Sequence, residues 1–364
     1  MYWVGLNLVK GIGSVRFKAL LDAFGSPEAA WNASPEAWKD VGLSQKIVES
    51  FQRVRKGVSL DQISNRIQSL GVEVLTWDDA SYPRHLNEID QPPPVLYVRG
   101  ALLPEDEWAV AIVGTRRVTA YGRQVAEEVA TALSQSGVTI VSGLARGIDS
   151  IAHQAAINAG GRTLAVLGNG IDQVYPPENR RLADQIMEHG ALISDYPLGT
   201  QPDGINFPPR NRIISGLSIA VIIVEAGLTS GALITATFAA EQGRDVFAVP
   251  GNINAPQSQG TNRLIRDGAQ PLLNPQDVLE ALNLSMVTEH RTVRVALPSD
   301  PVEARLFKLL THEPMHVDEI RAQADMPIET VSAALAMMEL KGMVRQVGGM
   351  NYVAVRERPE AYEA

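Results

Sequence analysis

The chain has 364 residues and a formal net charge of −9, and 45% of its residues are hydrophobic and 20% are charged. These fractions are typical of globular proteins and exclude wholesale disorder and fibrous architectures. Because there is no cysteine, disulfide bonds, cysteine–zinc sites and thiol catalysis are also excluded. No apolar run is long enough to span a membrane and the N-terminus lacks the pattern of a secretory signal, so we expect a soluble, intracellular protein with no membrane association.

Residues 1–66 have the spacing of short helices and form the first expected domain. A Gly-Ile-Gly turn at 11–13 precedes a helical pattern that ends at Gly25. The turn resembles those of SAM-like and helix-hairpin-helix modules, in which backbone N–H groups at a helix start face a phosphate. A plain helical packing unit fits the same residues, and the sequence leaves both interpretations open.

Residues 67–284 are expected to form an α/β domain on a doubly wound, mostly parallel sheet. Strand-like segments at 72–77 and 95–99 come first, and the prolines between them keep either strand from a central position near those prolines. Six apolar runs then alternate with helical patterns; they cover 109–114, 139–142, 163–167, 191–194, 219–224 and 245–249. Such alternation is typical of parallel strands covered by helices on both faces.

The C-terminal part contains an expected linker and a third domain. The linker is the polar stretch at 285–301, which carries two prolines and has no clear periodicity. Residues 302–356 have the pattern of three short helices followed by a hairpin that turns at Gly348 and Gly349, as in a winged helix. The third helix has almost no donor for a phosphate or a guanine, which favours a protein-contact module or packing cap over a DNA reader.

Small polar residues and arginines gather in the loops after four of the expected strands. In a doubly wound sheet these loops meet at one edge, where ligands bind. Small residues let backbone N–H groups approach phosphates, and arginine supplies positive charge. We therefore predict a polyanion or nucleotide site. Its candidate residues are Arg116, Arg117, Ser142, Gly143, Arg146, Phe207, Arg210, Asn211, Arg212, Ser230 and Gly231.

Plain structural roles are open for several of these residues. Arg117 or Arg146 could pair with a carboxylate such as Asp149, and Asn211 could bond a neighbouring loop. Phe207, which we expect on a loop, is either packed beneath the sheet or exposed as a platform for a base. A structural role is also favoured for His153, because no serine nucleophile accompanies it.

The motifs of common cofactor sites are missing. There is no GxxxxGK[ST], so a Walker-type ATP site is excluded, and Gln173 replaces the last glycine of a dinucleotide fingerprint that begins at Gly168. The six histidines lack metal-binding spacing. We therefore expect no cofactor and no metal site.

Segments spread along the chain resemble the DprA (Smf) family. They read GTRR at 114–117, SGLARGIDSIAH at 142–153, GNGIDQVYPPENRRL at 168–182, FPPRNRIISGLS at 207–218, EAGLTSGALITATFAAEQGRDVFAVPG at 225–251 and GTNRLIRDGA at 260–269. The resemblance is dense over 109–273 and extends to both flanking domains. It implies an extended Rossmann-fold domain between a SAM-like helical domain and a winged helix.

The resemblance also implies a function and partners. Such a protein is cytoplasmic and is a binding protein with no catalytic residue rather than an enzyme. It binds single-stranded DNA, forms homodimers, and loads the RecA recombinase onto DNA coated by single-strand-binding protein in natural transformation. No guanine-reading fork is evident among the candidate residues, so we expect tolerance of sequence. The positions that match the family's DNA-contacting motifs are Arg116, Ser142, Gly143, Phe207, Arg210, Asn211, Arg212, Ser230 and Gly231. Asn206 departs from the pattern, because a basic residue there would add a phosphate contact.

Two other functions stay open at this point. Glu225 and Glu241 beside a glycine-rich helix start resemble nucleotide phosphoribohydrolases of the lysine-decarboxylase-like group, although the PGGxGTxxE motif of those enzymes is not reproduced. A protein-interaction hub with a vestigial nucleic-acid site is the third hypothesis. Released base from AMP would identify the enzyme, and DNA-independent capture of RecA would identify the hub.

Overall fold

The computed structural model describes residues 1–282, 301–310, 315–340, 344–346 and 350–354. Contacts divide the chain into two compact units, residues 1–284 and residues 285–364. The linker expected at 285–301 lies outside the described residues, apart from Pro301. Within the described part of the chain, no helix is both long and apolar enough to cross a membrane.

Six helices precede the first strand: α1 (Tyr2–Asn7), α2 (Ser14–Phe24), α3 (Pro27–Asn32), α4 (Pro35–Asp40), α5 (Gln45–Gly57) and α6 (Leu60–Ser69). Two of these helices begin with a serine cap and a proline, because Ser26 and Ser34 accept the N–H groups of Ala29 and Ala37. The helix α2 ends at Gly25, as predicted, and Gly25 has the left-handed conformation.

The helical segment packs on the sheet as well as on itself. Its own core holds fully buried Phe17, Trp38 and Phe51. Val4 of α1 and Ile67 of α6 join the apolar cluster of the sheet domain. Because α6 crosses residue 66, the boundary between a first and a second domain stays a prediction.

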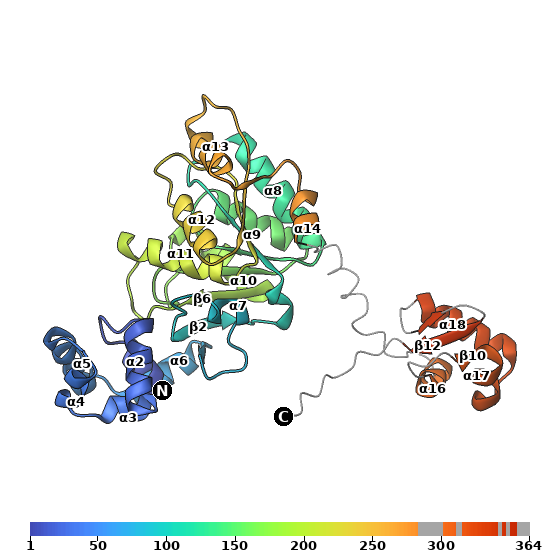
Figure 1. Ribbon diagram of the computed structural model, residues 1–364, viewed down its shortest axis with the longest axis horizontal. Coiled ribbons are helices and arrows are strands. Elements are labelled where there is room, and N and C mark those ends of the chain that lie inside the picture. Colours follow the sequence, from blue (N-terminus) through green and yellow to red (C-terminus); the bar gives the residue numbers. More distant parts are fainter. Residues whose placement is uncertain (283–300, 311–314, 341–343, 347–349, 355–364) are drawn as a thin grey trace. The chain divides into compact units, whose positions relative to one another are not determined.

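The sheet has nine strands in the order β1-β2-β6-β5-β4-β3-β7-β8-β9. Figure 1 shows two neighbouring strands of it, β2 and β6. Two strand pairs of this sheet, β1–β2 and β2–β6, are antiparallel, and the other pairs are parallel. The strands are β1 (Glu73–Thr76), β2 (Val95–Gly100), β3 (Ala109–Val113), β4 (Thr139–Ser142), β5 (Thr163–Val166), β6 (Gly190–Ser194), β7 (Ala220–Ile223), β8 (Asp245–Ala248) and β9 (Gln270–Pro271). The predicted mostly parallel sheet is confirmed.

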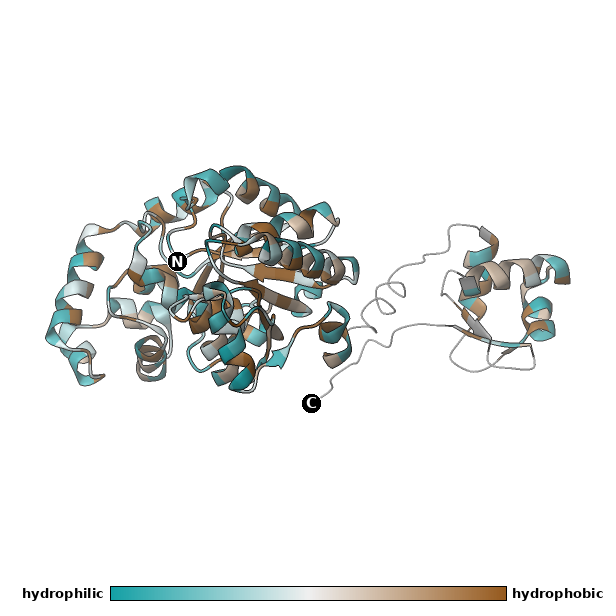
Figure 2. Ribbon diagram, turned by 90° about the horizontal axis from the view of Figure 1, so that it is seen from above, coloured by the Kyte–Doolittle hydropathy of each residue, from teal (hydrophilic) through white to brown (hydrophobic). Residues whose placement is uncertain are grey.

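Helices cover both faces of this sheet, and its apolar strands lie between them (Figure 2). On one face, Ile213, Ile214 and Ala236 pack on the strands, and on the other face Leu182 and Ile186 do so. The α-helices that follow β1 in this unit are α7 (Arg84–Asn87), α8 (Ala120–Gln135), α9 (Ile148–Asn158), α10 (Arg180–His189), α11 (Phe207–Gly216), α12 (Ala232–Glu241), α13 (Gln259–Arg266) and α14 (Gln276–Ala281).

One loop prediction is wrong. Phe207 and the residues after it were expected on a loop, but Phe207 is the first residue of α11. The prolines at 208 and 209 lie in the first turn, where the backbone N–H that proline lacks has no helical partner anyway. The side chains of Phe207, Arg210 and Asn211 are therefore placed by a helix.

The second unit has the winged-helix arrangement predicted from its pattern. Its elements are α16 (Pro301–Leu309), β10 (Met315–His316), α17 (Val317–Ala324), α18 (Ile328–Leu340), β11 (Val344–Gln346) and β12 (Asn351–Ala354). Leu306, Ile320 and Leu335 are fully buried among these helices. The two-residue strand β10 was not predicted, and the glycine turn at 348–349 lies outside the described residues.

Candidate nucleic-acid interface

A cavity of about 800 Å³ opens where the neighbouring strands β3 and β7 end. Its walls come from residues 113–117 after β3, from residues between 227 and 235 around the start of α12, and from the first turn of α11. We call it the edge cavity. Loops that follow parallel strands gather at one edge of the sheet, and ligands of doubly wound folds bind there.

The edge cavity brings together seven of the eleven predicted site residues: Arg116, Arg117, Phe207, Arg210, Asn211, Ser230 and Gly231. Its lining contains these three guanidinium groups and one carboxylate, that of Asp149. This surplus of positive charge suits a ligand that carries phosphates. The other four, Ser142, Gly143, Arg146 and Arg212, do not line it.

Arg116 and Arg117 are the exposed cations of the edge cavity. The backbone before them is fixed, because the N–H of Thr115 donates to the carbonyl of Glu225 at 2.8 Å. Neither guanidinium has a hydrogen-bond or ion-pair partner among the described residues. The structural ion pair considered for Arg117 is thus not formed within that part of the chain, and both cations are available to a ligand.

Phe207 presents an aromatic ring to the edge cavity, and Tyr175 stacks beside it. The two ring centroids are 5.8 Å apart with 23° between the planes, and Tyr175 is 37% exposed. The guanidinium carbons of Arg116 and Arg210 lie 5.6 and 5.9 Å from the centroid of Phe207. Sequence reasoning did not single out Tyr175, although an aromatic residue before two prolines in a strand-end loop could have indicated it.

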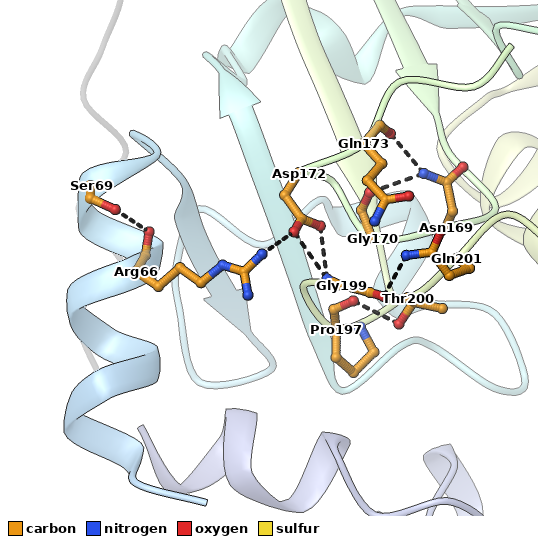
Figure 3. Close-up of polar contacts among 10 residues, drawn as sticks. All are labelled: Arg66, Ser69, Asn169, Gly170, Asp172, Gln173, Pro197, Gly199, Thr200 and Gln201. Atoms are coloured by element: carbon orange, nitrogen blue, oxygen red, sulfur yellow. Dashed lines mark hydrogen bonds and ion pairs between the residues drawn. The ribbon is translucent and has the colours of Figure 1, made fainter. Parts of the chain in front are cut away.

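Hydrogen bonds of Asn169 and Asp172 fix the loop behind Phe207 (Figure 3). A Cβ atom at Gly168 would lie 2.6 Å from Cδ1 of Phe207, so only glycine lets the ring occupy this position. The Asn169 amide donates to two carbonyls of the same loop, at 3.0 and 2.7 Å. Asp172 accepts Nη2 of Arg66 from α6 at 2.6 Å and a backbone N–H at 2.8 Å. The N-terminal helices thus help to position the loop on which Phe207 rests.

Arg210 lies beneath the aromatic ring and is 4% exposed. Its Nη1 donates to the carbonyl of Gly143 at 2.9 Å and also to that of Val166. Burial lowers the pKa of Arg210 to about 10, which leaves the group charged at neutral pH. Arg210 therefore joins the ends of β4 and β5 under Phe207, and its role in the site is mainly support.

Asp149 fixes the turn after β4. Its Oδ2 accepts the N–H groups of Gly143 at 3.2 Å and Ala145 at 3.4 Å. Burial raises the pKa of Asp149, and the positive charge of Arg210 opposes that rise. A Cβ atom at Gly143 would lie 2.8 Å from the Arg210 guanidinium, so the turn requires glycine. The N–H of Gly143, predicted to face a ligand, is used inside the protein.

The remaining residues outside the edge cavity also have protein partners. Ser142 is buried and donates its hydroxyl to a strand carbonyl at 2.6 Å. Arg146 forms an exposed ion pair with Glu178, so the pairing considered for it occurs with this carboxylate. Arg212 pairs with Asp195 at 2.8 Å. Their contact with a ligand stays a prediction, and the structure gives each of them a positioning role.

Ser230, Gly231 and Asn211 form the wall at the start of α12. Gly231 is the N-cap of the helix, and the hydroxyl of Ser230 accepts the N–H of Ala232 at 3.3 Å. The amide of Asn211 donates to the carbonyl of Gly231 at 3.3 Å, which is the bond to a neighbouring loop considered for it. A helix start has N–H groups without helical partners and a favourable dipole for anions.

The groups considered for catalysis do not meet in the edge cavity. Glu225 is 2% exposed and accepts both the N–H and the hydroxyl of Thr119. Glu241 lines a different hollow. His153 is fully buried against Thr163, with 2.6 Å between Nδ1 and Oγ1, and burial lowers its pKa to about 3. The structural role favoured for His153 agrees with this environment.

Family models match both units of the chain. The model described as DNA recombination-mediator protein A matches residues 73–283, and that of the DprA winged helix domain matches residues 290–350. A Synechocystis protein named Protein Smf is 38% identical over an alignment of 388 positions, which covers 96% of this chain and 98% of that protein.

Two solved structures show the same relationship. The X-ray structure of DNA processing protein A (DprA) from Streptococcus pneumoniae has a TM-score of 0.67 and 35% identity, and covers 77% of this chain and 95% of that one. DNA processing protein A from Helicobacter pylori, described for its single-stranded DNA binding mode, has a TM-score of 0.53 and 33% identity. That match covers 58% of this chain and 96% of the other.

Proposed function

The chain belongs to the DprA/Smf family, and on that premise we propose that it binds single-stranded DNA in the edge cavity. The observation that carries the proposal is that two exposed cations with no ion-pair partner among the described residues, Arg116 and Arg117, line the same cavity as the stacked rings of Phe207 and Tyr175. Phosphates of an unpaired strand contact the arginines, and a base stacks on Phe207. The binding mode described for the Helicobacter pylori protein gives this proposal its second support.

Such a site tolerates any sequence. Every base has a π-face, so stacking supplies affinity without selecting a base. The arginines contact the phosphate backbone, which carries no sequence information directly. Binding is therefore expected to weaken steeply as salt concentration rises, because each phosphate contact releases condensed counterions.

We propose that the protein acts on DNA by binding rather than by catalysis. The separate positions of Glu225 and Glu241 support this proposal, because the phosphoribohydrolase hypothesis needs carboxylates at the nucleotide. Incubation with AMP tests it: no free base should appear, and release of adenine would revive the enzymatic alternative.

From family membership we further infer a place for the protein in recombination. It forms homodimers in the cytoplasm and loads RecA onto single-stranded DNA coated by single-strand-binding protein during natural transformation. The helix α18 has exposed Glu329 and Glu339 and no lysine or arginine, which supports protein contact rather than DNA reading by the winged helix. Capture of purified RecA, with and without DNA and with the winged helix deleted, tests the partner and the contact surface.

A gel-shift titration tests the proposed function itself. Single-stranded and duplex oligonucleotides of equal length are titrated with the full chain at two ionic strengths. We expect tighter binding to the single strand and a loss of affinity at the higher salt. Equal affinity for the duplex would contradict the proposal.

A further inference from the structure

A second hollow lies beside the edge cavity, between helices α8, α9 and α10. Its volume is about 820 Å³, and residues of these three helices make up most of its lining. Arg116 lines both hollows, so they adjoin at this exposed residue. We call the second hollow the helical groove. None of the residues predicted from the sequence to contact DNA lies in it apart from Arg116.

The rim of the helical groove carries cations that are open to a ligand. Arg181, at the start of α10, is exposed and has no hydrogen-bond or ion-pair partner among the described residues. Arg123 on α8 is exposed too, and its one ion pair in that part of the chain is a 3.7 Å contact with Glu127, one turn away. Exposed pairs of this geometry contribute little to stability, so Arg123 is readily shared with another anion.

Negative charge on the rim is partly neutralised. The residues of the lining include two acids, Glu127 and Glu178, and three arginines, Arg116, Arg123 and Arg181. Glu178 is paired with Arg146, which lies outside the lining. The groove therefore keeps a net attraction for an anion even though the whole chain carries a net charge of −9.

The floor and the walls of the helical groove differ in polarity. Ile151, Ala155 and Leu182 form an apolar floor, and each is less than 9% exposed. Amide side chains stand around them, those of Gln154, Asn158 and Gln185. The apolar floor can contact the bases of a nucleic-acid strand, and the amide and guanidinium groups at its sides can bind the phosphates. No aromatic side chain lines the groove within the described residues, so its contribution comes from charge rather than stacking.

We propose that a single strand of nucleic acid held in the edge cavity passes Arg116 and continues along the helical groove, with its phosphates at Arg181 and Arg123. The inference rests on the proposed function and extends it to a longer binding path. Continuity through Arg116 favours this occupant over an acidic protein segment, because the same residue lines both hollows.

The test compares oligothymidylates of two lengths by fluorescence anisotropy on the full chain. A short probe of about six nucleotides fills the edge cavity alone, whereas one of about 20 nucleotides also reaches the groove, within the span of single-strand site sizes. The test variant carries Arg123→Ala and Arg181→Ala together. The matched control carries Arg53→Ala and Arg84→Ala, which remove two exposed arginines, one in an i,i+4 pair with Glu88 and one without a described partner.

The test variant should bind the long probe about fivefold more weakly than the control variant, as two exposed charge contacts imply. Its salt slope on the long probe should be smaller by about 1.4, that is about 0.7 for each lost phosphate contact. Its affinity for the short probe should be unchanged. Equal binding of the long probe by the two variants would overturn the proposal, and would leave the groove to a protein segment or to solvent.

Failure of the proposed function gives a different result. In that case the unaltered protein binds neither probe, or binds both no better than a duplex. Loss of short-probe affinity in the test variant, with an unchanged melting temperature, would also overturn the extended path, because it would place Arg123 and Arg181 at the edge cavity itself.

Discussion

The guanidinium carbon of Arg116 lies 5.6 Å from the centroid of the Phe207 ring, and both side chains line the edge cavity. One follows β3 and the other begins α11, far along the chain. The fold therefore places a phosphate ligand and a base platform side by side, which is what an unpaired nucleotide requires. In a duplex the bases are stacked on one another and are not free to reach Phe207.

Replacement of Phe207 separates stacking from charge. Phe207→Ala should lower affinity for an oligothymidylate by about 1–3 kcal/mol, because one base–aromatic stack is lost. The slope of log affinity against log salt concentration should not change, since no cation is removed. Anisotropy titrations at several salt concentrations measure both quantities. Phe207→Tyr, which keeps the ring, is the control, and unaltered affinity of Phe207→Ala would show that no base stacks there.

Arg210 is predicted to matter for stability more than for direct contact. Arg210→Ala should lower the free energy of unfolding by about 3 kcal/mol or more, because two buried carbonyls lose their donor and Asp149 loses a nearby cation. Arg116→Ala, on the surface, should change it by less than about 0.5 kcal/mol. Urea denaturation provides the comparison. A stable Arg210→Ala protein that no longer binds DNA would instead make Arg210 a ligand contact.

His153 makes stability depend on pH. Its pKa is about 3 in the folded protein, because burial disfavours the charged ring, and about 6.5 when unfolded. The unfolded chain therefore binds a proton first as pH falls below about 6.5, and stability present above that pH is lost on the way toward pH 3. Between pH 7 and pH 5 the loss from this group is about 2 kcal/mol.

The variant His153→Gln isolates this effect, because a glutamine does not titrate. Its free energy of unfolding should fall less than that of the unaltered protein between pH 7 and pH 5, by about 2 kcal/mol. Denaturant titrations at both pH values give the difference. Parallel pH profiles for the two proteins would mean that His153 is accessible to protons in the folded state.

The sequence contained enough to predict the sheet. Runs such as 109–113 and 220–223 are apolar at every position, which only a strand covered on both faces needs, and glycines and prolines bound them. Loops that follow parallel strands lie at the same edge of the sheet, so the sequence alone assigns Arg116 and Phe207 to one site. The winged helix could also be predicted, because turn residues separate its three helices.

Burial of individual polar residues could not be predicted in this way. Arg116 and Arg210 are both arginines at the same edge of the sheet, yet Arg116 is exposed and Arg210 is buried, with 4% of its surface exposed. The difference comes from α11, whose prolines suggested a loop and which turns Arg210 inward to carbonyls of two strands. Tyr175 was not predicted as a site residue, because its role depends on its contact with Phe207, and the sequence does not show that contact.

The most direct test of the central claim is the salt dependence of single-strand binding in a variant that carries Arg116→Ala and Arg117→Ala. The slope of log affinity against log salt concentration should be smaller by about 1.4 than in the unaltered protein, with about 0.7 from each lost phosphate contact. The Arg53→Ala/Arg84→Ala variant, with the same change in net charge, should keep the original slope. If the two variants show the same slope and affinity, the strand is not held at the edge cavity.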